Sequence, residues 1–381
     1  MKKVVIAIDS FKGCLTSSEV IQAATEGILQ IQPSCKVISI PISDGGEGLL
    51  ETLTPLLKVQ KRVISVHGPL MEPIQGEYGI SCDGKTALIE MANVSGLPLV
   101  PIEKRNPMQT TTYGLGELIV DALEQGCREF IIGIGGSATN DAGLGMLQAL
   151  GFRFTDKDGN LLGIGGQCLS KVAQIDKTYI HPALSTAHFT IACDVQNPFC
   201  GPEGAAYVFA AQKGATPDMI KKLDEGMYLF SQVILSETGI NLHNYPGAGA
   251  AGGLGGGFIA FLNAELKSGI QLILDTLHFE EQIKGADWII TGEGKMDKQT
   301  TMGKVPFGIL KAAQKQQIPV IAIAGCIEDV ELLNHVGFQA VFSITPKPVT
   351  LEKAMNPIFA KKNIRQLISQ IFRLQNSSSL Q

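Results

Sequence analysis

The sequence has little of what marks membrane, secreted or nucleic-acid-binding proteins. Its apolar runs fall short of the roughly 20 residues that a membrane-spanning helix requires. Only five apolar residues lie between Lys3 and Asp9, too few for the hydrophobic region of a secretory signal. Lysine and arginine are scattered and the formal net charge is only −5, which argues against nucleic acid or an anionic membrane as the main partner. We therefore expect a cytoplasmic protein that acts on a small, diffusible molecule.

Cysteine and histidine occur without the spacing of metal or catalytic sites. The eight cysteines are dispersed and include no Cys-x-x-Cys pair, and the six histidines form no His-Glu-x-x-His pattern. A Gly-x-Ser-x-Gly motif is also missing. We therefore expect buried free thiols rather than disulfides or zinc, and neither a histidine-based metal site nor serine hydrolysis.

Strands and helices alternate at both ends of the chain. An apolar run ends at Asp9-Ser10-Phe11-Lys12-Gly13, and Thr16 or Ser17 then caps a helix that extends to about residue 30. Similar apolar runs lie at residues 36–42, 288–291, 318–324 and 339–344, and segments of helix length separate the last three runs from one another. This alternation predicts right-handed βαβ units in a doubly wound parallel sheet, with the common strand order 2-1-3-4-5.

The pattern changes in the middle of the chain. Short strands at 59–66, 74–81 and 86–91 are joined by turns, and alternating helices and strands follow. We interpret this part as a second, mixed α/β domain inserted into the first. The predicted domains are residues 1–60 plus 279–381, and residues 61–278. A length of 381 residues also favours two domains over one.

The most informative stretch runs from residue 287 to residue 308. A buried strand is predicted at 288–291, and a loop dense in glycine and charge follows it. Glycines allow close approach of a ligand, carboxylates hold Mg²⁺, and lysines neutralise phosphoryl charge, so the mixture suits a metal-bound polyphosphate. A solvated connection between strand and helix is the alternative. The residues concerned are Gly292, Glu293, Gly294, Lys295, Asp297 and Lys304. In the predicted strand order, this loop and residues 9–12 face one crevice.

Two familiar motifs match the sequence but not its context. GISCDGKT at 79–86 satisfies the phosphate-loop pattern, yet the flanking runs look like strands around an Asp-Gly turn. Residues 133–138 and 247–252 satisfy the dinucleotide fingerprint, which keeps an NAD-dependent hydroxy-acid dehydrogenase as an alternative. The first strand, however, ends in DSFKG, where a simple Rossmann enzyme carries its glycines.

Several loops of the middle region are candidates for binding a substrate. Ser137, Asn140 and Asp141 lie at a predicted helix start and favour an anion site, and Arg105 precedes a second helix start. Solvated basic residues beside a threonine cap are the alternative for Arg105. The glycine run at 247–257 is either a nucleotide-phosphate cradle or a close-packing element.

One acidic residue is the best candidate for acid–base chemistry. Asp194 follows a predicted strand at 189–193 and precedes Asn-Pro and glycines. An acid at the carboxyl end of a strand is well placed to accept the proton of an attacking hydroxyl or to orient that hydroxyl. A turn or helix-cap role is the alternative.

Together these stretches resemble a family, the bacterial glycerate kinases that phosphorylate D-glycerate with ATP. The matching stretches run in family order: DSFKG (9–13), SDGGEG (43–48), DGKTALIEMANVSGL (83–97), NPMQTTTYGLGELI (106–119), GIGGSATNDAGLGMLQALG (133–151), CDVQNPFCGPEGAAYVFAAQKGA (193–215), PGAGAAGGLGGGFIAFL (246–262) and TGEGKMDKQTTMGKVPFG (291–308). Departures are small: Ala211 replaces a usual proline, and Lys295 and Lys298 replace a common arginine and glycine. Lys295 therefore lacks the bidentate geometry of an arginine.

The resemblance implies phosphoryl transfer from ATP to D-glycerate with Mg²⁺. It also implies a flavodoxin-like domain, a second α/β domain and an active site in the cleft between them, with 2-phosphoglycerate favoured over 3-phosphoglycerate as product. A non-catalytic sugar-acid binding protein stays an alternative, and a homodimer is left open. On the matching motifs we place four sets of site residues. The catalytic residues are Asp194 and Lys295, and the substrate-binding residues are Arg105, Ser137, Asn140 and Asp141. The nucleotide phosphates are bound by Ser10, Lys12, Gly252, Gly253, Gly292, Gly294 and Lys304, and the metal is bound by Asp44, Glu47, Glu293 and Asp297.

Overall fold

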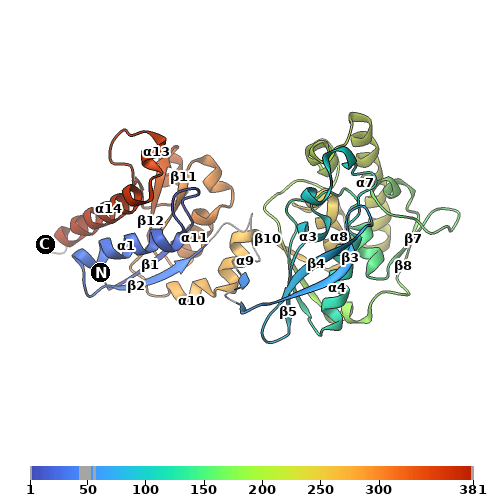
Figure 1. Cartoon of the computed structure of the whole chain (residues 1–381), viewed down its shortest axis with the longest axis horizontal. Helices are drawn as coiled ribbons and strands as arrows, with labels where there is room; N and C mark the ends of the chain where they lie inside the picture. The colour runs from blue at the N-terminus through green and yellow to red at the C-terminus, as the bar shows by residue number, and fades with distance from the viewer. Residues whose placement is uncertain (1, 43–52, 55–56, 379–381) are drawn as a thin grey trace. The chain divides into compact units, whose positions relative to one another are not determined.

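The computed structural model describes residues 2–42, 53–54 and 57–378. The chain divides into two compact units, Met1–Gly45 with Ile270–Gln381 (unit 1) and Gly46–Gly269 (unit 2), and each is described by itself (Figure 1). Both units are α/β, as predicted. The predicted domain boundaries, after residues 60 and 278, lie C-terminal to the limits of the compact units. The exact domain boundaries therefore stay a prediction.

Unit 1 is built on a five-stranded parallel sheet. Its strands are β1 (Lys3–Ile8), β2 (Lys36–Pro41), β11 (Trp288–Met296), β12 (Val320–Ile327) and β13 (Ala340–Ser343). They follow the order β13-β12-β11-β1-β2, and each neighbouring pair is parallel. This is the predicted order 2-1-3-4-5, so β1 and β11 are neighbours at the point where the winding direction reverses.

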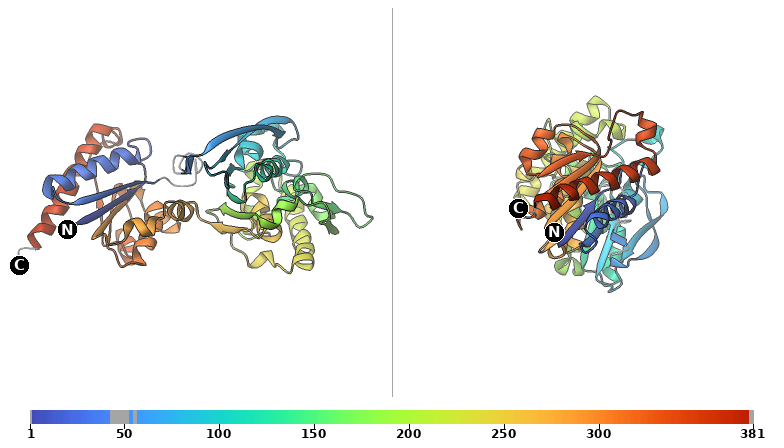
Figure 2. Two further views of the ribbon diagram at one scale, coloured as in Figure 1. Left: turned by 90° about the horizontal axis from the view of Figure 1, so that it is seen from below. Right: turned by 90° about the vertical axis from the view of Figure 1, so that its left-hand side faces the viewer.

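Helices cover both faces of this sheet (Figure 2). Helix α1 (Ser17–Ile31) begins where Thr16 and Glu19 form a capping box, and it shares one buried core with α14 (Pro357–Ser378) and the strands. Its apolar residues Val20, Ala24 and Ile28 recur at helical spacing and are fully buried. The remaining helices of unit 1 are α9 (Gly269–Thr276, which starts at the boundary), α10 (Phe279–Ile283), α11 (Val305–Gln314), α12 (Val330–Val336) and α13 (Leu351–Ala354).

Strand β11 is longer than the sequence predicted. We expected it to end at Thr291, but its pairing with β12 continues to Met296. A side chain at Gly292 would place its Cβ 1.9 Å from the carbonyl oxygen of Ile323. Gly292 therefore permits close strand pairing rather than a turn. Glu293 and Lys295 therefore lie on a strand, whereas Asp297 and Lys304 lie in the connection that follows it.

Unit 2 holds a six-stranded mixed sheet in the order β10-β9-β6-β5-β4-β3. The strands are β3 (Gln60–His67), β4 (Pro73–Ile80), β5 (Thr86–Glu90), β6 (Glu129–Gly133), β9 (His188–Ala192) and β10 (Glu265–Lys267). Strands β4 and β5 are antiparallel neighbours around the Asp83-Gly84 turn. The phosphate-loop pattern at 79–86 is thus a hairpin, as its context indicated. A separate pair joins β7 (Arg153–Thr155) to β8 (Gln174–Asp176).

The helices of unit 2 enclose a second buried core. They are α3 (Ala92–Ser95), α4 (Tyr113–Glu124), α5 (Leu144–Ala149), α6 (Ala205–Phe209), α7 (Pro217–Thr238) and α8 (Ala250–Leu262). Among the residues that the structure describes, no helix has the length and hydropathy that crossing a membrane requires.

The glycine-rich run at 247–257 leads into α8, which begins at Ala250, and most of it is buried. A Cβ at Gly252 would lie 2.1 Å from the carbonyl oxygen of Thr139, and one at Gly256 would lie 2.6 Å from the ring of Phe199. Gly252 and Gly253 also have positive φ values. The structure therefore shows the close packing that we had kept as one of two alternatives; Gly252 and Gly253 are buried, and their contact with a phosphate stays a prediction.

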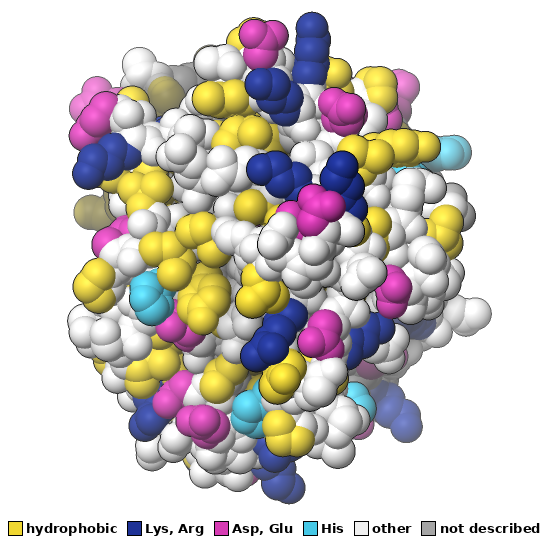
Figure 3. Space-filling model, turned by 90° about the vertical axis from the view of Figure 1, so that its right-hand side faces the viewer, with side chains coloured by type: hydrophobic (Ala, Val, Ile, Leu, Met, Phe, Trp, Pro, Cys, Tyr) yellow, Lys and Arg dark blue, Asp and Glu magenta, His cyan; other side chains and the backbone are white. Residues whose placement is uncertain are grey.

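The surface of unit 2 carries charges of both signs. Figure 3 shows one face, on which basic and acidic side chains are interspersed rather than gathered by sign. The expectations on nucleic acid, membrane and homodimer formation stay predictions.

Candidate active site

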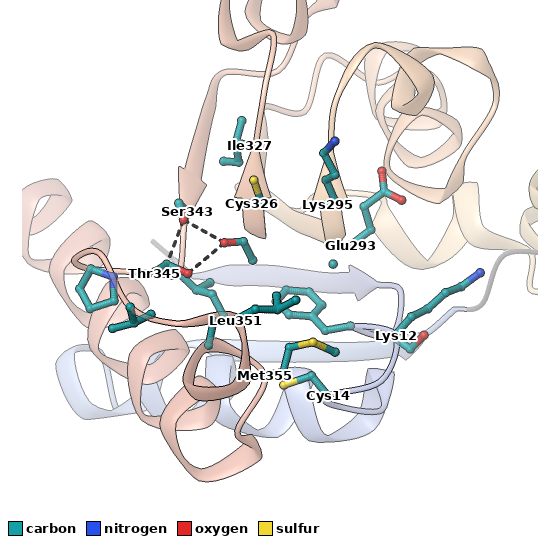
Figure 4. Close-up of a pocket in the computed structure, with 18 of the residues that line it drawn as sticks. Lys12, Cys14, Glu293, Lys295, Cys326, Ile327, Ser343, Thr345, Leu351 and Met355 are labelled. Atoms are coloured by element: carbon teal, nitrogen blue, oxygen red, sulfur yellow. Dashed lines mark hydrogen bonds between the residues drawn. The ribbon is translucent and has the colours of Figure 1, made fainter.

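Unit 1 contains a cavity of about 1020 Å³ at the carboxyl ends of its strands (Figure 4). Residues after β1, the second half of β11, the end of β12 and the segment 343–355 line it. Ligand pockets in proteins span about 300–1,000 Å³, so this cavity can admit a ligand of nucleotide size. Its position beside the β1–β11 switch point is where open α/β sheets bind ligands.

The two loops that the strand order predicted to face one crevice do lie together. The Asp9 amide donates to the carbonyl oxygen of Gly292 at 3.1 Å. A Cβ built on Gly294 would lie 3.6 Å from the backbone nitrogen of Lys12. Ser10 and Lys12 line the cavity from one side, and Gly294 lines it from the other.

Glu293 is a buried charged residue of this cavity. Its side chain accepts a hydrogen bond from Thr300 Oγ1 at 2.6 Å and lies 3.5 Å from Lys304 Nζ. Burial raises the pKa of Glu293, although Thr300 and Lys304 oppose the shift. The carboxylate thus ionises at a higher pH than an exposed glutamate does.

Lys295 and Asp297 follow at two-residue spacing. Lys295 Nζ lies 3.0 Å from Glu328 and 3.4 Å from Asp297, and its hydrogen bonds to these carboxylates raise its pKa. Burial opposes ionisation of Asp297, but the Gln299 amide and Lys295 outweigh burial and lower its pKa. Lys295 is therefore a cation and Asp297 an anion near neutral pH.

The predicted metal site is only partly described. Glu293 and Asp297 come from one short segment, whereas Asp44 and Glu47 lie outside the described residues. Within the described ranges, no group of three or more His, Cys, Asp or Glu could hold a metal ion. Mg²⁺ commonly binds one or two carboxylates together with substrate phosphates and water, so Glu293 and Asp297 suit Mg²⁺ chemically. The full four-carboxylate set stays a prediction.

In unit 2, Asp141 is part of the buried framework. It is 0% exposed and accepts hydrogen bonds from the Thr112 amide at 2.8 Å and the Thr112 hydroxyl at 2.9 Å. The Gly143 and Gly145 amides also donate to it. Burial raises its pKa in spite of these donors. Sequence reasoning chose Asp141 as a substrate ligand by residue type, but the structure uses its oxygens to hold the starts of α4 and α5.

Asn140 is also 0% exposed, and its amide donates to the Met227 sulfur. Its Oδ1 atom and the hydroxyl of Thr139 are buried without a hydrogen-bond partner in the structure. Ser137 is 8% exposed. Ser137 is therefore the most accessible of the three residues predicted in this loop to bind substrate.

Lys213 is a charged residue that sequence reasoning missed. The residue is 2% exposed, and its ammonium group donates to Ser137 Oγ at 2.7 Å and to the Thr139 carbonyl at 2.6 Å. Burial lowers its pKa to about 7. The next residue, Gly214, has φ +93 and packs against Arg105, since a Cβ there would lie 2.3 Å from the Arg105 carbonyl oxygen. The backbone of Arg105 thus lies beside the residue that follows Lys213, and the Arg105 side chain donates to the Val100 carbonyl oxygen at 3.4 Å.

Asp194 lies two residues beyond β9. Its Oδ1 atom accepts a hydrogen bond from the Gly269 amide at 2.9 Å, at the first residue of α9. The structure therefore shows the helix-cap contact that we had kept as an alternative. Asp194 is nevertheless exposed, and its catalytic role stays a prediction. It belongs to unit 2 with Arg105 and Ser137, so a site shared with unit 1 also stays a prediction.

Comparison with known proteins supplies the family. A family model described as the glycerate kinase family matches residues 4–376. The chain is 46% identical over 356 residues to a glycerate kinase of Halalkalibacterium halodurans, covering 93% of this chain and 94% of the relative. It is 47% identical to a glycerate 2-kinase of Escherichia coli, covering 92% of this chain and 93% of the relative. A crystal structure described as glycerate kinase 2 from Salmonella typhimurium LT2 superposes with a TM-score of 0.82 at 41% identity, and both chains are covered completely. The chain therefore belongs to the glycerate kinase family.

Proposed function

We propose that this protein is a D-glycerate 2-kinase, which transfers the γ-phosphoryl group of ATP to the 2-hydroxyl of D-glycerate. The observation that carries the proposal is the cavity of unit 1, where lysines and a buried glutamate lie at the switch point of a doubly wound sheet. Family membership supports the reaction class. The relative named glycerate 2-kinase, at 47% identity, supports the 2-hydroxyl as acceptor.

The nucleotide phosphates occupy the charged part of the cavity. Lys12, Lys295 and Lys304 line it and neutralise the negative charge of the triphosphate. Glu293 and Asp297 would hold Mg²⁺, which would supply neutralisation of the charge that develops on the phosphate oxygens. Catalysis of this kind needs positioning and electrostatic stabilisation more than covalent participation of the protein.

The acceptor binds in unit 2, in a site that includes Lys213. The glycerate carboxylate is held by Arg105, Ser137 and Lys213, which are cationic or hydrogen-bond donors. Asp194 orients the 2-hydroxyl and accepts its proton while the hydroxyl oxygen forms a bond to the γ-phosphorus and the bond to the ADP oxygen breaks. The two units close for the reaction and exclude water, which limits hydrolysis of ATP.

The alternatives have less support. The dinucleotide fingerprint at 133–138 follows β6, but α5 begins only at Leu144. The strand-turn-helix unit that would place a pyrophosphate on a helix start is therefore not formed there. A sugar-acid binding protein without activity would bind glycerate but release no ADP.

Coupled detection of ADP tests the proposal directly. We expect ADP release with ATP, Mg²⁺ and D-glycerate, and none when D-glycerate is omitted. L-lactate with NAD is the control for dehydrogenase activity and should give no NADH. Phosphorus NMR of the product distinguishes 2-phosphoglycerate from 3-phosphoglycerate. Glycerate binding without ADP release would refute the kinase assignment.

A further inference from the structure

We infer that the cavity of unit 1 has a second, apolar subsite that binds the base and ribose of the nucleotide, formed by residues 344–355 together with Cys14. The inference rests on the proposed function, because ATP is the ligand whose phosphates the lysines of this cavity would attract. It adds the part of the site that contacts the nucleoside.

The lining of the cavity is divided by chemistry: the part contributed by residues 344–355 is mostly apolar, with Thr345 and Lys347 as its polar members. Figure 4 shows Leu351, Met355 and Cys14 close together, whereas Lys12, Glu293 and Lys295 lie toward another side. Leu351 is 75% exposed and Met355 is 37% exposed. When a ligand covers large apolar side chains in a cavity, the burial of their surface makes the free energy of binding more favourable. A planar base linked through ribose to the phosphates would reach them.

The apolar wall is built on a tethered segment. The hydroxyl of Thr345 donates to the Gly325 carbonyl at 3.0 Å, the hydroxyl of Ser343 donates to the same oxygen at 3.2 Å, and the Thr345 amide donates to Ser343 Oγ at 3.1 Å (Figure 4). Pro346 and Pro348 follow and restrict the backbone further. The wall is thus held against the end of β12 before any ligand binds, which lowers the entropic cost of binding.

The two parts together match one nucleoside triphosphate. A cavity of about 1020 Å³ exceeds what three phosphates alone would fill. The charged part suits the phosphates and the apolar part suits an uncharged, flat group, which are the two chemical halves of ATP. Pockets of this kind bind through apolar walls and gain orientation from a few polar groups.

Cys326 provides a reporter of occupancy that does not depend on catalysis. It is an exposed free thiol of the cavity lining, and it pairs across the strands with Lys295. Cys82 is an exposed free thiol of unit 2 and serves as an internal control. Cys14 also lines the cavity, but burial, and secondarily Glu19, raises its pKa, so it reacts more slowly.

The test measures alkylation of Cys326 by iodoacetamide, with mass spectrometry as the readout. In the unmodified protein, both ATP and inorganic tripolyphosphate should slow labelling of Cys326 and leave Cys82 unchanged. In Leu351→Asn, the ATP concentration that halves the labelling rate should rise at least about tenfold. The concentration of tripolyphosphate required should stay the same, because tripolyphosphate lacks a base. The asparagine introduced at position 351 is uncharged, so repulsion of the phosphates is avoided.

Ile358→Asn is the matched control. Ile358 is 80% exposed and does not line the cavity, so its replacement should change neither concentration. Met355→Gln provides a second test if Leu351→Asn fails to fold. The inference is overturned if ATP fails to protect Cys326 from labelling, or if the Leu351 and Met355 variants bind ATP normally. It is also overturned if either variant weakens the binding of ATP and the binding of tripolyphosphate equally. Protection by ATP that depends on Leu351 would support the subsite even if no ADP were released, so the two proposals fail separately.

Discussion

Replacement of Lys213 by methionine removes a buried ammonium group and keeps most of the side-chain volume. Burial lowers the pKa of Lys213 from 10.5 to about 7. Between these values the unfolded chain holds a proton that the folded protein has released, so the free energy of unfolding should rise with pH. This lowering of the pKa changes the free energy of unfolding by about 5 kcal/mol in total. About 3 kcal/mol of that change occurs between pH 7 and pH 9.5.

The variant should lose this pH dependence. Lys213→Met also removes the donors to Ser137 Oγ and the Thr139 carbonyl, a loss of about 1–3 kcal/mol per unsatisfied group. That loss is nearly independent of pH. The difference in the free energy of unfolding between Lys213→Met and the unmodified protein should therefore change by about 3 kcal/mol across this pH range. This change does not depend on the size of the difference at pH 7.

Urea unfolding with brief alkylation pulses measures the effect in each unit. Cys127 is a buried thiol of unit 2 and Cys35 is a buried thiol of unit 1, so their labelling midpoints report the two units separately. Trp288, the one tryptophan of the sequence, lies in unit 1 and provides a fluorescence control. The reasoning is refuted if Cys127 shows the same pH dependence in both proteins.

Two further predictions concern Asp194 and Gly292. Asp194→Asn keeps an oxygen that accepts from the Gly269 amide, so the fold should persist while turnover falls at least about a hundredfold, the scale of a lost acid–base group. Near-normal turnover in the coupled ADP assay would remove Asp194 from the mechanism. Gly292→Ala would place a methyl group 1.9 Å from the Ile323 carbonyl oxygen and should lower the urea midpoint of unit 1, measured by Trp288 fluorescence. Gly294→Ala on the same strand, where a Cβ would meet only ordinary contacts at 3.6 Å or more, is the control, and an equal effect of both substitutions would contradict the close-pairing role of Gly292.

The topology of unit 1 could be predicted because local signals agree with the fold. Apolar runs such as Val4–Ile8 alternate with capped helices, and only parallel pairing with right-handed crossovers accommodates them. The end of β11 was predicted wrongly because Gly292 to Met296 has the composition of a loop. Pairing with β12 overrides that local preference.

The roles of buried polar residues could not be predicted, because burial depends on distant parts of the chain. Asp141 and Lys213 are both charged residues near glycines in the sequence. Asp141 is enclosed by Thr112 and two glycine amides, and Lys213 is enclosed by residues more than 70 positions away. No local pattern distinguishes such residues from exposed ones. The apolar wall at 344–355 was missed for a related reason, since its function depends on facing Lys12 and Glu293 across a cavity.

The extension of β11 leads to one more prediction, because it fixes the directions of Glu293 and Lys295, and Asp297 follows directly after the strand. Side chains at two-residue spacing on a strand point to the same side, and pairing with β12 holds that strand in place. Thr300 adds a further support, since its hydroxyl donates to Glu293 at 2.6 Å and accepts from the Asp297 amide at 3.1 Å. Thr300→Val removes both contacts without changing the shape of the side chain.

We expect turnover in Thr300→Val to fall about tenfold, the usual scale for a lost group that orients a metal ligand. Burial already raises the pKa of Glu293, and the hydrogen bond from Thr300 opposes that shift. Its removal should raise the pKa further, so the acidic limb of the pH–rate profile should move to higher pH, because the carboxylate form is lost sooner as the pH falls. Thr300→Ser keeps the hydroxyl and should restore the normal profile. An acidic limb that stays in place in Thr300→Val would show that ionisation of Glu293 does not limit the reaction.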